Sequence, residues 1–65
     1  MLNMIDKHPD SFRRMYEDVQ SSKNPNFVGI VGAHPELVVE AGSQMSLVYH
    51  LMEYINKQKE RDNNP

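Results

Sequence analysis

The clearest hydrophobic periodicity in the chain runs from Ser43 to Lys59. At 100° per residue, the apolar side chains of this stretch fall within roughly half of a helix circumference, and the polar ones lie opposite. Two adjacent apolar pairs, Leu47-Val48 and Leu51-Met52, are incompatible with a strand, whose neighbouring side chains point to opposite faces. The pattern predicts an amphipathic helix over about 43–60. The polar residues 62–65 are expected to form a disordered tail.

Four apolar residues in the first third of the chain recur at the i, i+3, i+4 and i+7 spacing of a helix face: Phe12, Met15, Tyr16 and Val19. They predict a second amphipathic helix over about 9–22, with Pro9 at its first position, where a proline is well tolerated. Residues 1–7 are expected to form a turn or a short helix. A break at Pro9 is favoured over a kink, because a proline inside a helix costs about 3 kcal/mol.

The segment between these two helices is ambiguous. Its β-branched residues and glycines would suit a hairpin that pairs 27–31 with 37–41, and the fold would then be α+β. The alternative is one or two short helices, over about 25–32 and 35–41, each opened by a proline and closed by a glycine. A lone two-stranded hairpin is only marginally stable in water, which favours the helices. The sequence therefore predicts a single all-α domain over 1–61.

The apolar face of the 43–60 helix is too wide for the other predicted helices to cover. In a monomer, part of this face is expected to stay exposed, and such a patch usually marks an interface. The residues expected to remain exposed are some of Leu47, Leu51, Tyr54 and Ile55. A 65-residue chain without cysteine also has little to stabilise it as a monomer, so we expect homodimerisation to close the fold. The predicted dimer interface is the apolar face of this helix: Met45, Leu47, Val48, Leu51, Met52, Tyr54 and Ile55.

Charge and hydropathy set limits on the partners. The net charge of −2 gives no overall attraction to nucleic acid or to anionic lipid. No apolar run approaches the roughly 20 residues of a membrane span, and the N-terminus lacks the zones of a signal peptide, so a cytoplasmic protein is expected. The alternative function is a small dimeric DNA-binding regulator. It would use two groups of basic residues, which acidic neighbours interrupt: Arg13 and Arg14, and Lys57, Lys59 and Arg61.

The sequence contains no arrangement typical of an active site. Cysteine is absent, and no serine has a histidine and a carboxylate in a legible relation to it. The glycines of the middle segment do not form a phosphate loop, because no Lys-Ser/Thr follows them. Two pairs at helical spacing offer metal-ligand atoms but are more simply explained as surface charge: His50 with Glu53, and Glu36 with Glu40. We therefore expect no enzymatic activity, no cofactor and no metal.

Elimination leaves protein binding as the expected function. Five methionines and three tyrosines in so short a chain favour adaptable contact surfaces. We expect a small non-enzymatic protein–protein interaction module, such as a regulator, an inhibitor or an adaptor. It would work as a homodimer and bind an unidentified protein partner.

Overall fold

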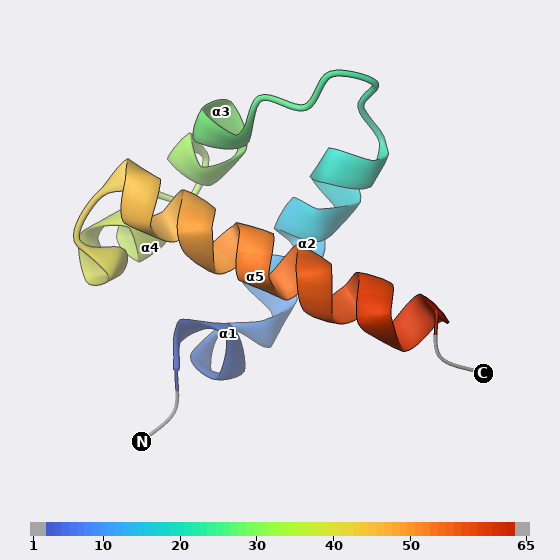
Figure 1. Cartoon of the computed structure of the whole chain (residues 1–65). Helices are drawn as coiled ribbons and strands as arrows, with labels where there is room; N and C mark the ends of the chain where they lie inside the picture. The colour runs from blue at the N-terminus through green and yellow to red at the C-terminus, as the bar shows by residue number, and fades with distance from the viewer. Residues whose placement is uncertain (1–2, 64–65) are drawn as a thin grey trace.

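A computed structural model describes the backbone of residues 3–63 and the side chains of residues 3–61. Helices occupy most of these residues, and none of the described residues forms a strand (Figure 1). The helices are α1 (Met4–Lys7), α2 (Pro9–Gln20), α3 (Phe27–Gly32), α4 (Pro35–Ala41) and α5 (Gln44–Asn63). The predicted all-α fold is confirmed, and the α+β alternative with a hairpin at 27–31 and 37–41 is wrong.

The observed helices agree with the predicted ones to within a few residues. A break separates α1 from α2 at His8, as the proline at position 9 predicts. The helix α3 begins at Phe27 rather than at 25, because the Asn26 side chain caps it there. The helix α5 extends to Asn63, so the backbone of residues 62 and 63 is helical where a disordered tail was predicted. Residues 64 and 65 of that tail lie outside the described residues.

Side-chain caps explain why such short segments are helical. The Oδ1 atom of Asn3 accepts a hydrogen bond of 2.9 Å from the Asp6 amide at the start of α1. In the same way, Oδ1 of Asn26 accepts one of 3.2 Å from the Gly29 amide at the start of α3. Each bond satisfies an amide that has no partner within its helix. The two caps stabilise α1 and α3 locally. The Asn26 cap favours a helix in a segment whose β-branched residues alone would suggest a strand.

The turn between α4 and α5 requires a glycine. Gly42 has a φ of 99°, and among the described residues no other has a positive φ. This left-handed conformation is available to glycine without a steric penalty, and it ends α4. The next residue, Ser43, accepts a hydrogen bond of 3.0 Å from the Ser46 amide and so starts α5. The chain therefore passes from α4 to α5 through two residues, Gly42 and Ser43.

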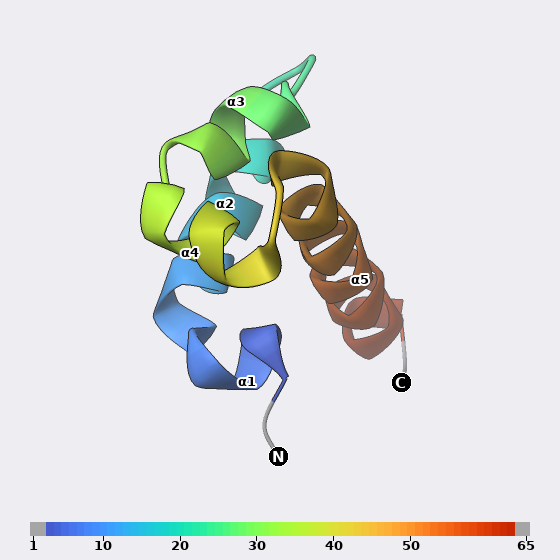
Figure 2. The ribbon, with the colours of Figure 1, turned by 90° about the vertical axis from the view of Figure 1, so that its left-hand side faces the viewer.

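The long helix α5 packs against all of the other helices. Figure 2 shows α1 to α4 on one side of the molecule and α5 on the other. Each of these four helices contacts α5. The second long helix, α2, meets α5 through an aromatic cluster in which the Tyr54 ring centroid lies 5.8 Å from those of Phe12 and Tyr16. Because the other helices lie on one side, α5 has one buried face and one open face.

The hydrophobic core draws on all five helices of the described region. Four of its members belong to α5, and no polar side chain among the described residues is buried with them. The core consists of Met4, Phe12, Met15, Val31, Leu37, Leu47, Val48, Leu51 and Ile55.

The core corrects the expectation that the wide face of α5 stays exposed in a monomer. Leu47 and Leu51 have no exposed surface, Ile55 is 8% exposed, and Tyr54 is half-buried. For the buried residues the expectation was wrong, because it did not count the cover that the short helices provide; Met45 and Met52 of the same face are exposed. The helices α1, α3 and α4 each contribute a buried side chain, Met4, Val31 and Leu37 respectively, and so widen the cover that α2 alone would provide.

Candidate functional site

The open face of α5 carries three large apolar side chains, Met45, Tyr49 and Met52. They are 52%, 66% and 45% exposed, respectively. Their spacing of four and three residues places them within about 60° of one another around the helix. They therefore form one continuous row, which we call the outer stripe (Met45, Tyr49 and Met52).

The outer stripe is the exposed edge of the broad apolar face of α5, and the buried residue Val48 lies between it and the centre of the core face. The stripe lies roughly 120° around α5 from the buried row of Leu47, Leu51 and Ile55. Continued at the same spacing, the stripe reaches Asn56 and Lys59, both exposed and polar. The apolar part is therefore confined to the first half of α5. An exposed row of this kind on a small domain is a candidate contact surface.

Along α5 itself, no charged residue lies between the two ends of the outer stripe. The first turn of α5 contains no acidic residue. The nearest carboxylate along the helix is that of Glu53, whose Oε1 lies 3.4 Å from Nζ of Lys57, and both side chains are 54% exposed. From residue 44 to residue 52 the helix carries no Asp, Glu, Lys or Arg. The row itself therefore contains no charge that a partner would desolvate.

The seven residues of the predicted dimer interface differ in burial: two are exposed, one is half-buried and four are buried. Met45 and Met52 lie on the outer stripe, and Tyr54 is half-buried against α2. The other four pack inside the chain's own core and are not available to a partner in this fold: Leu47, Val48, Leu51 and Ile55. Sequence reasoning missed Tyr49, although its i+4 spacing from Met45 could have revealed it. Dimerisation itself stays a prediction.

The basic residues considered for nucleic-acid binding are exposed on two different helices. Arg13 and Arg14 lie on α2, and Lys57, Lys59 and Arg61 lie on α5. Acidic side chains accompany them, since the Lys57 ammonium pairs with Glu53 in the preceding turn. The DNA-binding function stays a prediction.

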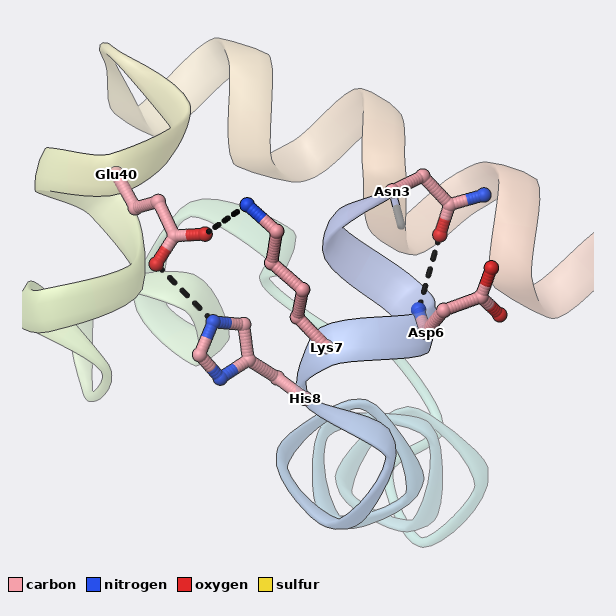
Figure 3. A network of polar contacts seen from close by, with 5 residues as sticks. All are labelled: Asn3, Asp6, Lys7, His8 and Glu40. Carbon is pink, nitrogen blue, oxygen red and sulfur yellow. Dashed lines mark hydrogen bonds and ion pairs between the residues drawn. The ribbon is translucent and has the colours of Figure 1, made fainter. Parts of the chain in front are cut away.

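A polar cluster connects α4 with the junction of α1 and α2 (Figure 3). Its centre is the Glu40 carboxylate, which accepts from two neighbours. Nε2 of His8 lies 3.1 Å from Oε1 of Glu40, and Nζ of Lys7 lies 3.5 Å from Oε2. The hydrogen bond from His8, together with the positive charges of His8 and Lys7, lowers the pKa of the Glu40 carboxyl below its ordinary value. The cluster therefore ties together segments more than 30 residues apart in sequence.

The Glu40 cluster predicts a specific pH dependence of stability. Because the folded-state pKa of Glu40 is lowered, the stabilisation is present above the ordinary value of 4.5 and is lost as the pH falls through the lower folded value. We expect Glu40→Gln to lower the melting temperature slightly at pH 7 and by less at about pH 3, since more of the wild-type carboxyl is then protonated. Thermal unfolding followed by circular dichroism at both pH values measures this difference.

Glu36→Gln is the matched control, because Glu36 belongs to the same helix and is 68% exposed on its side chain. Its one ion-pair contact among the described residues is with His34, at 3.8 Å. We expect a smaller effect at pH 7 than that of Glu40→Gln. Equal effects of the two changes would show that the bridge to His8 and Lys7 adds nothing to stability.

The acidic and histidine side chains do not gather elsewhere. Among the described side chains, no three of His, Asp and Glu lie close enough together to hold a metal ion. Glu40 already pairs with Lys7 and His8, and Glu53 already pairs with Lys57.

In the part of the chain that the structure describes, no helix has the length and apolar character needed to cross a lipid bilayer.

Comparison of the chain with models of protein families, with curated proteins and with solved structures finds no match.

Proposed function

We propose that the protein is a small non-enzymatic protein-interaction module that works as a homodimer and associates through the outer stripe of α5. The observation that carries this proposal is the exposed row of Met45, Tyr49 and Met52 on a helix whose adjacent face is already buried. Tyrosine and methionine are enriched in protein interfaces, and methionine adapts its shape to a partner. The lack of charge from residue 44 to residue 52 makes the surface inexpensive to desolvate.

Size arguments favour a reversible homodimer. Twofold association is the commonest assembly of soluble proteins, and a 65-residue domain gains stability from it. Three side chains alone do not supply the roughly 800 Å² that each partner buries in a stable interface, so flanking polar residues must contribute. We therefore expect weak association, with a dissociation constant in about the micromolar range.

Sedimentation of the wild type and of Tyr49→Asp tests the proposal. We expect the wild type to form dimers as its concentration rises through roughly 1–500 µM. Tyr49→Asp is expected to stay monomeric and helical, because it places a charge in the centre of the outer stripe without touching the core. Val39→Asp is the matched control, since Val39 is an exposed apolar residue of α4, 80% accessible, that lies off the stripe.

The control variant should dimerise like the wild type. A wild type that is monomeric over the whole concentration range would refute the homodimer. A Tyr49→Asp variant that still dimerises like the wild type would show that another surface mediates association.

A further inference from the structure

We propose that the two copies meet antiparallel along α5, with Tyr49 on the twofold axis. This inference rests on the proposed homodimer and specifies its geometry. The outer stripe is nearly symmetric about Tyr49, since Met45 precedes it by four residues and Met52 follows it by three. An antiparallel pair centred on Tyr49 therefore places Met45 level with Met52 of the partner subunit. Such self-complementarity is what a twofold interface requires, because each contact occurs twice with the roles exchanged.

The chemistry of the stripe suits this register. Each Tyr49 ring would lie beside the ring of its symmetry mate, with a methionine of each copy at either end. Thioether sulfur atoms make favourable contacts with aromatic rings, often at the ring edge. The side chains concerned are the exposed ones of α5, so the pairing needs no rearrangement of the core.

The position of Lys59 argues against a parallel pair. Lys59 continues the spacing of the outer stripe, so a parallel arrangement would place it against Lys59 of the partner subunit and would align the two helix dipoles. In the antiparallel register, Lys59 is ten residues, or about 15 Å, from the axis. The partner's α5 begins only five residues, or about 8 Å, from the axis. Lys59 therefore projects beyond the start of the partner's helix.

Glu53 supplies the electrostatic complementarity that points to a second copy of the chain. It follows Tyr49 by four residues, which is about 6 Å along the helix, and so lies level with the first turn of the partner's α5. That turn has no acidic residue of its own to balance the positive end of the helix dipole. Glu53 also lies beside the stripe rather than opposite it, at about 40° from Tyr49 around the helix. The Glu53 side chain is 54% exposed, and its contact with Lys57 one turn further along is a weak surface pair, so its carboxylate can turn toward the partner.

Cysteine cross-linking tests this geometry directly, because the chain has no cysteine. In an antiparallel pair, Tyr49→Cys places the two sulfur atoms near the axis. Asn56→Cys is the matched control on the same spacing, and its two copies would be about 20 Å apart, well beyond the roughly 4.4–6.8 Å between Cα atoms that a disulfide allows. We expect Tyr49→Cys to cross-link at least tenfold faster than Asn56→Cys under mild oxidation.

A mixture of Met45→Cys and Met52→Cys provides a second measurement that leaves Tyr49 in place. We expect the mixed disulfide dimer to exceed either self-linked dimer severalfold. Equally fast cross-linking of Tyr49→Cys and Asn56→Cys, or preferential self-linking of Met45→Cys, would show a parallel pair and overturn the inference. Slow cross-linking of all four variants, with a wild type that sediments as a dimer, would refute this geometry but leave the homodimer intact. A monomeric wild type would refute both.

Discussion

Leu51→Asp is expected to unfold the protein. Leu51 has no exposed surface and lies in the middle of the buried face of α5. No buried polar side chain exists among the described residues to pair with a carboxylate there. The change removes apolar burial and introduces an unpaired charge, at a cost above about 4 kcal/mol. A 65-residue domain has a total stability of only about 3–10 kcal/mol, so far-ultraviolet circular dichroism should show loss of helix at 25 °C.

Tyr49→Asp is the matched control for this prediction, because it introduces the same side chain two residues away on the open face. We expect it to retain the helical spectrum and a cooperative thermal transition. The pair of variants separates folding from association, since Leu51→Asp should lose both and Tyr49→Asp only the second. A folded and dimeric Leu51→Asp variant would mean that the buried face of α5 is wrongly assigned.

Phe12→Ala is expected to cause the second largest loss of stability. The Phe12 side chain is fully buried, and its ring centroid lies 5.8 Å from that of Tyr54, so it fills the contact between α2 and α5. Removal of a buried phenylalanine ring costs about 3–5 kcal/mol, from lost burial and from the cavity that remains. Urea unfolding of the variant, followed by circular dichroism, measures the change in the free energy of unfolding. The urea concentration at the midpoint of unfolding should fall. If the loss is about 5 kcal/mol, no folded baseline should remain.

Two further variants identify the cause of this loss. Phe12→Leu keeps much of the buried volume and should lose less stability than Phe12→Ala. Val39→Ala removes an apolar group that is 80% exposed, so we expect a change within about 0.5 kcal/mol. If Phe12→Ala were as stable as Val39→Ala, the aromatic cluster could not be a part of the core.

The positions of the helices followed largely from the sequence. The apolar rows of α2 and α5 recur with the helical period, and prolines open α2 and α4. Caps such as Asn26 and the left-handed Gly42 act over three or four residues. Such local signals can be read from a short stretch of sequence without knowledge of the tertiary fold. The middle segment was harder because its β-branched residues also suit a strand, and the packing of Val31 and Leu37 in the core supports the helical form.

The candidate site was only partly predictable. The apolar periodicity predicted an interaction surface on the helix that is α5 in the structure, and that surface included Met45 and Met52. It did not separate these two residues from Leu51, and it omitted Tyr49. The spacing of residues along a helix shows which side chains share a face. It does not show how much of a broad apolar face the neighbouring helices cover. The boundary between the core and the outer stripe is set by the helices that pack on α5.

The sequence by itself thus determined the two long helices and the breaks between elements, because helix formation depends on side-chain periodicity, capping and turn residues within a few positions of one another. Only the tertiary structure decided which side of α5 is covered and which residues remain open. It also brought Glu40 to His8, 32 positions away in the chain. Burial and such pairs arise from contacts between distant segments, and no local pattern encodes them.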